Sequence, residues 1–338
     1  MIKRIDIENR EYEILSPLAF KVKESKGRAI DEEKCEFRTD FQRDRDRIVH
    51  SKAFRRLIHK TQVFLSPEGD HYRTRLTHTL EVAQVSRTVA RILAYNEDLT
   101  EAIALGHDLG HTPFGHVGEA VLNKIHPGGF VHSQQSLRTV DVIEDTSRRR
   151  GLNLTFEVRD GILNHSSSGS PATREGQIVQ ICDRIAYVNH DIDDAIRGGI
   201  IKGHDIPERI TDVIGHSLTE RINTMIHGVV TYSGGKDDIV MNPEIEEAML
   251  DLRSFLFENV YTNPAAKAQE VQAENLVTYL YEYYMSHIDK LPEEYLAMIS
   301  DREEPEERVV CDYIAGMTDR FAVNKLKDLF IPSQWDVM

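Results

Sequence analysis

Apolar residues recur every three or four positions along most of the chain, and runs that alternate apolar with polar residues are scarce. Within residues 76–93, Val82, Val85 and Val89 fall on one helical face at about 100° per residue. His78 lies on the same face, so we expect its side chain to point into the core. This spacing predicts an all-α fold.

A second amphipathic helix is predicted over residues 177–197. Its apolar face carries only branched aliphatic residues, namely Ile178, Ile181, Ile185, Val188, Ile192 and Ile196. The opposite face carries a polar stripe of Asp183, Tyr187, His190, Asp191 and Asp194. Such a stripe faces either solvent or a binding site. The amphipathic ring of Tyr187, one turn from each of two carboxylates, favours a site.

Apolar residues 102–105 predict a further helix, which we expect to end at Gly110. Thr112 then caps the next helix, with Pro113 at its first position, where the missing N–H costs nothing. Helix breaks are expected where glycine, proline, serine or acidic residues cluster, near 66–69, 127–129, 166–171, 198–199, 234–235 and 301–307.

Composition narrows the class of protein. At 338 residues, with 40% of them hydrophobic, the chain is long enough for one large globular domain or two ordinary ones. No apolar run approaches the roughly 20 residues that span a bilayer, and residues 1–6 lack the apolar stretch of a secretory signal. The three cysteines are scattered and are interpreted as reduced thiols. We therefore predict a cytoplasmic protein with no membrane partner.

The charge distribution is uneven. A formal net charge of −15 argues against a protein that coats nucleic acid, because such binding depends on lysine and arginine. Positive charge is nevertheless concentrated in residues 38–60. We interpret this segment as a local basic patch that can hold a polyphosphate.

Two imidazoles and two carboxylates can together form a divalent metal site. His107 and Asp108 form the first of three His-Asp dipeptides, His78 faces inward, and Asp183 lies on the polar stripe. Taken alone, His78 also fits a core histidine bonded to a carbonyl group. A mixed nitrogen and oxygen set suits manganese, iron, cobalt, nickel or magnesium better than a thiolate-type structural zinc. The other dipeptides need no special role: His190-Asp191 and His204-Asp205.

These residues and their flanks resemble the HD-domain metal-dependent phosphohydrolases, and within them the deoxyguanosine triphosphate triphosphohydrolase family. The similarity runs nearly from end to end, through residues 38–48, 51–57, 60–64, 72–78, 106–119, 183–194 and 312–320. The resemblance implies one divalent metal per site, Mn²⁺ or Mg²⁺, with iron, cobalt and nickel as alternatives. The implied ligands are His78, His107, Asp108 and Asp183.

The resemblance also implies a reaction, the hydrolysis of deoxynucleoside triphosphates to the deoxynucleoside and inorganic triphosphate by attack at the α-phosphorus. His116 and Glu119 match the family's catalytic histidine and its acidic partner, and His111 matches a histidine beside the phosphates. On the predicted helix, His116 and Glu119 lie one turn apart near its positive end. His132 is the competing candidate for proton transfer.

Substrate contacts follow from the same resemblance. Gln62 and Asp191 match residues that contact the sugar 3′-hydroxyl, and Tyr187 matches a tyrosine that leaves no room for a 2′-hydroxyl. Arg75 and Arg184 match positions that reach phosphates. A second set can equally form a solvated basic face or a subunit interface: Arg55, Arg56 and Lys60.

We expect a single unit over residues 1–338, with a basic segment at 1–60, an HD core at 61–200 and a helical region at 201–338. The family suggests a homo-oligomer, commonly a hexamer, and activating nucleotides at separate sites. Two alternatives stay open. One is a nucleotidase or phosphodiesterase with another nucleotide substrate, and the other is a non-catalytic regulator that binds nucleotides or single-stranded nucleic acid. The preferred deoxynucleotide does not follow from the sequence.

Overall fold

The computed structural model describes residues 1–62, 73–145, 149–262 and 264–332, except for the side chains of residues 264–268. Within these residues the fold is all-α, with sixteen α-helices and two isolated β-bridges but no sheet. The predicted fold class is therefore confirmed. No described helix combines the length and apolar character needed to cross a bilayer. The divisions at residues 60 and 200 stay predictions.

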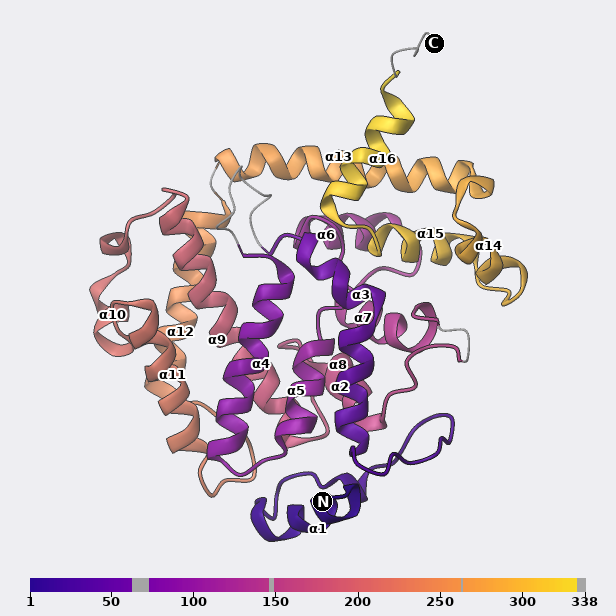
Figure 1. The fold of residues 1–338 in the computed structure, drawn as a ribbon. Coiled ribbons are helices and arrows are strands. Elements are labelled where there is room, and N and C mark those ends of the chain that lie inside the picture. Colours follow the sequence, from indigo (N-terminus) through magenta and orange to yellow (C-terminus); the bar gives the residue numbers. More distant parts are fainter. Residues whose placement is uncertain (63–72, 146–148, 263, 333–338) are drawn as a thin grey trace.

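The centre of the molecule is a group of helices that run side by side (Figure 1). These helices are α2 (Asp40–His50), α4 (Arg75–Ile92), α5 (Glu97–Gly106), α8 (Phe156–Asn164) and α9 (Arg174–Arg197). The hydroxyl of Thr74 caps α4 by accepting a hydrogen bond from the Thr77 amide. Thr173 caps α9 in the same way through the Gly176 amide. Apolar faces of these helices then form one buried core, which includes Phe41, Leu99 and Ile162.

A second core lies between α9 and three helices on one flank of the bundle (Figure 1). Those helices are α10 (Glu208–Ile214), α11 (Leu218–Ser233) and α12 (Pro243–Leu256). The isoleucine face of α9 is buried here as predicted, apart from Ile196, which is exposed. The polar stripe of α9 does not face solvent either: Asp183 and His190 contact α4, and Asp191 contacts Tyr261, which follows α12.

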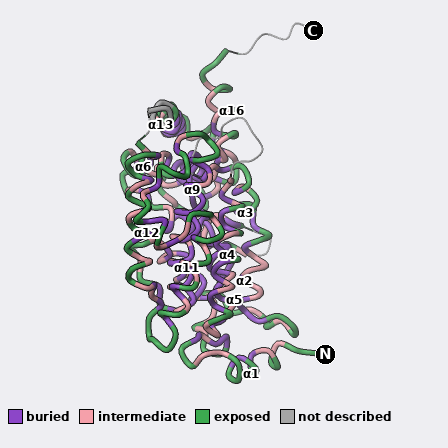
Figure 2. The backbone as a smooth tube through the Cα atoms, turned by 90° about the vertical axis from the view of Figure 1, so that its left-hand side faces the viewer, coloured by how far each residue is buried: buried purple, intermediate pink, exposed green. Residues whose placement is uncertain are grey.

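The C-terminal helices form a third core across one end of the bundle. Helix α13 (Pro264–Ser286) crosses that end (Figure 1) and packs on α6 (Gly115–Ile125), α15 (Glu306–Ala315) and α16 (Asp319–Phe330). Helix α14 (Glu293–Ser300) packs on α15. Figure 2 shows the buried residues running through the middle of the molecule and α16 projecting past its end. The remaining α-helices are α1 (Arg4–Ile14), α3 (Lys52–Arg56) and α7 (His132–Arg138).

The predicted breaks at 127–129, 166–171, 198–199, 234–235 and near 301–305 separate helices as expected. The predicted break at 66–69 lies outside the described residues.

The predicted end of the helix before the first His-Asp dipeptide is wrong. Helix α5 ends at Gly106, and His107 is its C-cap. Gly110 serves close packing instead, since a Cβ atom there would lie 2.1 Å from the backbone nitrogen of Ser136 in α7. A helix stop and a close backbone approach both select glycine, so the sequence alone does not distinguish them.

The predicted start of α6 is also wrong. The helix begins at Gly115, two residues after Pro113, and Phe114 and Gly115 have left-handed φ angles of 62° and 57°. The hydroxyl of Thr112 donates to the Gly115 carbonyl at 2.8 Å and does not cap an amide. The Phe114 amide donates to Asp319 Oδ1 at 2.9 Å. A contact with a residue far along the chain therefore sets where this helix begins.

The basic patch expected in residues 38–60 is largely neutralised. Arg43 and Arg47 both pair with Glu32, and Arg45 pairs with Glu101 at 3.0 Å. These ion pairs fasten the N-terminal segment and α2 to their neighbours. The expectation that this run of arginines holds a polyphosphate is therefore wrong for these three residues.

Glu175 joins the N-terminal segment, α5 and α9. Its Oε1 accepts hydrogen bonds from the amides of Phe20 at 2.9 Å and Asn96 at 3.0 Å. Its Oε2 is buried and has no hydrogen-bond partner among the described residues. Burial raises the pKa of Glu175 from 4.5 to about 7, although the amide hydrogen bonds act in the opposite direction. Ionising this carboxyl group therefore destabilises the folded chain.

The Glu175→Gln substitution is expected to stabilise the protein above neutral pH and to change its stability little near pH 4.5. The folded pKa of about 7 exceeds the unfolded value of 4.5, so wild-type stability is lost as the pH rises between them. The expected gain for the variant at high pH is up to about 3 kcal/mol. Urea denaturation over this pH range measures it, with exposed Glu247→Gln as the control. A stability difference that stays constant with pH would contradict the assignment.

Candidate active site

The structure brings together the four residues predicted as metal ligands, from three separate helices. His78 lies on α4, His107 and Asp108 follow α5, and Asp183 lies on α9. His78 Nε2 is 3.0 Å from Asp183 Oδ1, and His107 Nε2 is 3.6 Å from Asp108 Oδ2 and 3.8 Å from Asp183 Oδ1. The donor atoms of His78, His107 and Asp108 lie within 4.8 Å of one another.

These residues fit a divalent cation. His107 donates from Nδ1 to the Ala104 carbonyl at 2.7 Å, which leaves the lone pair on Nε2. That Nε2 atom is buried and has no hydrogen-bond partner among the described residues. A histidine that donates one ring nitrogen to a backbone carbonyl and turns the other toward carboxylates has the arrangement of a metal ligand. The metal would satisfy a buried atom that otherwise has no partner.

Both carboxylates at this centre are held in the ionised form. Burial raises the pKa of Asp183, but the hydrogen bond from His78 and the electrostatic interaction with the neighbouring histidines lower it to about 2. Burial also opposes ionisation of Asp108, whose pKa is held well below its usual range by His107 and Arg75. Ionised carboxylates are the form that binds a cation.

Arg75 connects the predicted ligand set to a predicted substrate contact. Its Nη1 donates to Asp108 Oδ2 at 2.7 Å and its Nη2 donates to the Gln62 carbonyl at 3.3 Å. Gly115 leaves the space for this arrangement, because a Cβ atom there would lie 3.1 Å from both Arg75 Nη2 and Gln62 O. The buried guanidinium is therefore fixed beside the carboxylate that we expect to hold the metal.

A second cluster centres on Glu119. Its Oε1 accepts hydrogen bonds from the amide of His132 at 2.8 Å and from His132 Nδ1 at 2.9 Å. Its Oε2 lies 3.2 Å from His116 Nδ1 and 4.0 Å from His111 Nε2. Burial opposes ionisation, but the hydrogen bonds from His116 and His132 hold the pKa of Glu119 far below its usual range. Glu119 is therefore a partly buried anion shared by two histidines.

The two clusters adjoin each other. The rings of His111 and His132 stack with their centroids 4.7 Å apart, and the donor atoms of Asp108, His111 and His132 lie within 4.8 Å of one another. His116 differs from these neighbours because its side chain is 76% exposed, whereas that of His132 is 16% exposed. A ligand arriving from solvent therefore meets His116 first.

His165 belongs to the site and was not predicted. Its Nε2 lies 3.2 Å from His132 Nε2, and its ring centroid lies 5.0 Å from that of His107. It is the C-cap of α8 and donates from Nδ1 to the Ile162 carbonyl at 2.7 Å. Burial, reinforced by the electrostatic effect of the neighbouring histidines, lowers the pKa of His165 to about 4. The only indication of His165 in the sequence is its position at a helix end, because His107 likewise ends a helix and donates to the carbonyl three residues before it.

Two of the three predicted sugar-binding residues, Tyr187 and Asp191, lie along the polar stripe of α9, whereas Gln62 precedes α4. Asp191 is buried, and its Oδ2 accepts a hydrogen bond from the hydroxyl of Tyr261. Burial raises the pKa of Asp191 to about 7. Tyr187 is partly buried against the core that α9 shares with α11 and α12. Tyr261 is a second residue that the sequence did not reveal, because it follows α12 and lies 70 positions from its partner.

Arg184, the predicted phosphate contact on α9, is paired with a carboxylate of α12. Arg184 lies 3.5 Å from Glu246 on α12, whereas Arg75 contacts Asp108. The two arginines predicted to bind phosphate are therefore tied to different helices. His190, which was given no role, is buried, with its Nε2 atom 3.1 Å from Glu81 Oε2.

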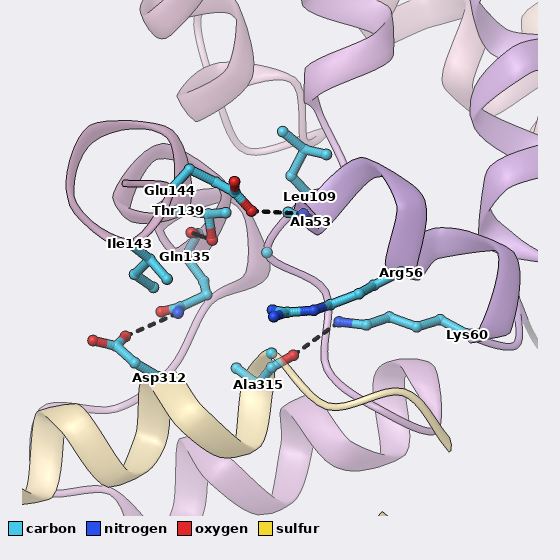
Figure 3. A pocket seen from close by; sticks show the side chains of 12 residues that line it. Ala53, Arg56, Lys60, Leu109, Gln135, Thr139, Ile143, Glu144, Asp312 and Ala315 are labelled. Carbon is cyan, nitrogen blue, oxygen red and sulfur yellow. Dashed lines mark hydrogen bonds between the residues drawn. The ribbon is translucent and has the colours of Figure 1, made fainter. Parts of the chain in front are cut away.

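Residues from the C-terminal helices hold in place the segment that follows His107 and Asp108. We call each of these contacts a brace. The ammonium group of Lys60 is buried between the carbonyls of His111 and Ala315, so it is neither a solvated face nor a phosphate contact. Figure 3 shows Lys60 and Arg56 extending toward Ala315 from one side of a cavity. Burial and the charge of Arg56 lower the pKa of Lys60 to about 7. Asp319 adds a second brace through the Phe114 amide.

Two protein-family models match the chain. The HD domain matches residues 75–188, a range that contains the four predicted ligands, and the phosphohydrolase-associated domain matches residues 239–328. The second range begins just before α12 and ends within α16. It therefore covers the helices that brace the site.

Relatives match along nearly their whole length. A deoxyguanosinetriphosphate triphosphohydrolase-like protein from Caldanaerobacter subterraneus is 60% identical over 97% of this chain and 96% of its own length. A protein of the same name from Desulfatibacillum aliphaticivorans is 49% identical, with 98% and 99% covered. Among solved structures, a phosphohydrolase from Bacteroides thetaiotaomicron matches with a TM-score of 0.53 and 17% identity, covering 85% of this chain and 69% of that one. A hypothetical protein from Aquifex aeolicus matches with a TM-score of 0.50 and 18% identity, covering 84% and 67%. These two structural matches show a shared fold.

The Gly115→Ala substitution is expected to destabilise the protein by about 2 kcal/mol, against about 1 kcal/mol for Gly199→Ala. Both glycines have left-handed φ angles, but only Gly115 has neighbours, Arg75 and Gln62, that an added Cβ atom would crowd. Gly199 has open space and so isolates the backbone effect. Urea denaturation measures both changes. Equal losses would show that the contact with Arg75 does not depend on this glycine.

Proposed function

The chain belongs to the family of deoxyguanosinetriphosphate triphosphohydrolase-like proteins, and we propose that it hydrolyses deoxynucleoside triphosphates to the deoxynucleoside and inorganic triphosphate. The HD domain and the buried His and Asp cluster make it a metal-dependent phosphohydrolase. One observation supports the more specific proposal, the release of inorganic triphosphate from deoxynucleoside triphosphates. A cation-binding set that includes the unpartnered His107 Nε2 adjoins a histidine and glutamate cluster suited to proton transfer.

In the proposed reaction, the oxygen of water bonds to the α-phosphorus and the bond from that phosphorus to the 5′-oxygen breaks. Water gives up a proton, and the departing 5′-oxygen gains one. The residues proposed to hold the metal are His78, His107, Asp108 and Asp183. When bound, Mn²⁺ or Mg²⁺ would supply Lewis-acid polarisation of the phosphate oxygens. Arg75, held beside Asp108, is positioned to add a second positive charge against the same oxygens.

We assign proton transfer to His116 in preference to His132. His132 makes hydrogen-bond contacts at both ring nitrogens, with Glu119 and with His165. His116 contacts Glu119 through Nδ1 and keeps an exposed side chain, so its Nε2 is available to exchange a proton with substrate. Glu119 then orients His116 and stabilises its charged form. We propose that His111, stacked on His132, lies beside the phosphates.

Selection of the sugar is proposed to depend on α9. Tyr261 occupies one oxygen of Asp191, so the other oxygen is available to a sugar hydroxyl. Gln62 is proposed as its counterpart across the site, and Tyr187 as the ring that excludes a 2′-hydroxyl. Arg184 is paired with Glu246 on α12. It must therefore release this carboxylate before it can contact a phosphate. The homo-oligomer, activating nucleotides and cytoplasmic location stay predictions.

Purified protein loaded with Mn²⁺ or Mg²⁺ is expected to release inorganic triphosphate from at least one deoxynucleoside triphosphate, and the deoxynucleoside in equal amount. Ion-exchange chromatography of the products over all dNTPs and NTPs, with and without each metal, measures this. Ribonucleotides are expected to react poorly because Tyr187 closes the 2′ position. Release of pyrophosphate or single phosphate alone would reject the proposed reaction and favour another nucleotidase.

The Asp108→Ala substitution is expected to lower turnover at least about a hundredfold and to weaken Mn²⁺ binding, because it removes a carboxylate from the proposed metal site. The matched control is Asp205→Ala, which changes an exposed dipeptide of the same sequence, His204-Asp205. Isothermal titration with Mn²⁺ and circular dichroism separate metal loss from unfolding. Unchanged turnover in a folded Asp108 variant would remove this residue from the mechanism.

A further inference from the structure

Three residues of the polar stripe of α9 lie one helical turn apart. Asp183, Tyr187 and Asp191 are spaced at intervals of four residues, so their side chains leave neighbouring positions on one face, about 6 Å apart along the helix axis. Asp183 belongs to the proposed metal site, which would lie against the phosphates of a nucleotide. A sugar that extends from those phosphates along α9 passes Tyr187, and its far edge, which carries the 3′-hydroxyl, meets Asp191.

Asp191 is a buried carboxylate with a single hydrogen-bond partner among the described residues. Its Oδ2 accepts a hydrogen bond from the hydroxyl of Tyr261. Asp194, on the next turn, is instead neutralised by Arg73, whose Nη1 lies 3.0 Å from Asp194 Oδ1. Asp191 forms no such ion pair in the part of the chain that the structure describes. Because a buried carboxylate is stable only when its oxygens are hydrogen-bonded, Oδ1 is the position at which a donor from a ligand fits.

Tyr261 is held in place by contacts other than the one with Asp191. It is the last residue of η5 (Phe257–Tyr261), a single π-helical turn that continues α12, and its ring packs on the core that α9 shares with α11 and α12. The ring also lies edge-on to Phe257, with the ring centroids 6.5 Å apart. Single π-helical turns occur frequently at functional sites. Packing thus fixes the ring of Tyr261, and its hydroxyl fixes one oxygen of Asp191.

The two residues come from different parts of the chain. Asp191 lies just past the HD-domain match at residues 75–188, and Tyr261 lies within the phosphohydrolase-associated match at residues 239–328. We propose that Tyr261 is a positioning residue that directs the free oxygen of Asp191 toward the 3′-hydroxyl of the sugar, and that the pair restricts the site to nucleotides whose 3′-hydroxyl is free. The inference rests on the proposed function. The single proton of the Tyr261 hydroxyl is donated to Asp191, so Tyr261 acts on the substrate through that carboxylate.

A fixed acceptor discriminates more strongly than one that can turn. A 2′,3′-dideoxynucleotide brings no donor, and its sugar would cover Asp191 Oδ1 and leave that oxygen unpaired. A 3′-phosphate removes the same donor and adds negative charge next to a buried carboxylate. Without the Tyr261 hydroxyl, the carboxylate is free to rotate and both of its oxygens can find water. The substrate that lacks a 3′-hydroxyl is then disfavoured much less.

The experiment compares Tyr261→Phe, which keeps the ring and removes the hydroxyl, with Tyr281→Phe as the matched control. The control removes a tyrosine hydroxyl that contacts His126 at 3.3 Å in the C-terminal core. The ratio of kcat/KM for a dNTP to that for the ddNTP of the same base is measured with Mg²⁺. We expect a ratio of at least about ten in the parent protein and in Tyr281→Phe, and of less than about three in Tyr261→Phe. The value of kcat/KM for the ddNTP is expected to stay within about threefold of the parent value.

A double-variant comparison tests whether Tyr261 acts through Asp191. Asp191→Ala is expected to lower the ratio as Tyr261→Phe does, and the double variant to lower it no further. Equal losses for the dNTP and the ddNTP in Tyr261→Phe would show a merely structural role and overturn the proposal, as would independent effects of the two substitutions. If the parent protein hydrolyses no deoxynucleotide, the proposed function fails. The same ratio, taken from dissociation constants measured by isothermal titration with Mg²⁺, then decides the role of Tyr261, and equal binding of dNTP and ddNTP by the parent protein rejects it.

Discussion

The hydrogen bond from His107 Nδ1 to the Ala104 carbonyl is the contact on which the site depends. A helix leaves its last carbonyls without amide partners, and here a ring N–H satisfies one of them. The same bond decides which ring nitrogen keeps its lone pair and turns that nitrogen toward Asp108 and Asp183. His165 makes the equivalent hydrogen bond at the end of α8. Two helix ends thus supply two oriented imidazoles, and the bundle core holds both in place.

Helix α9 contributes both to the hydrophobic core and to the candidate active site. Its isoleucine face is buried in the core shared with α11 and α12, and its polar residues are enclosed between α4 and the segment that follows α12. Carboxylates there are stable only with partners, and they find them in His78 for Asp183 and in Tyr261 for Asp191. The apolar core therefore fixes the rotation of α9, and that rotation delivers its polar residues to the site.

Local periodicity was sufficient to predict the parts of this protein that depend on single helices. The phase of Val82, Val85 and Val89 placed His78 inward, and it is 1% exposed. Prediction failed where a distant contact decides the local structure. Asp319 sets the start of α6 by accepting a hydrogen bond from the Phe114 amide. Lys60, which the charge pattern assigned to a basic patch, instead donates to the carbonyl of Ala315. His165 escaped notice because its partner, His132, is 33 positions away and no spacing rule connects them.

The brace formed by Lys60 has a consequence for how the protein is made. Lys60 and Ala315 are separated by 255 positions, and Thr61 and Asp319 by 258. During synthesis the proposed metal ligands and the Glu119 cluster leave the ribosome long before the residues that fix the segment between them. The site is therefore completed only when α15 and the start of α16 emerge, and a nascent chain that already contains every proposed catalytic residue still lacks the support that holds them in register.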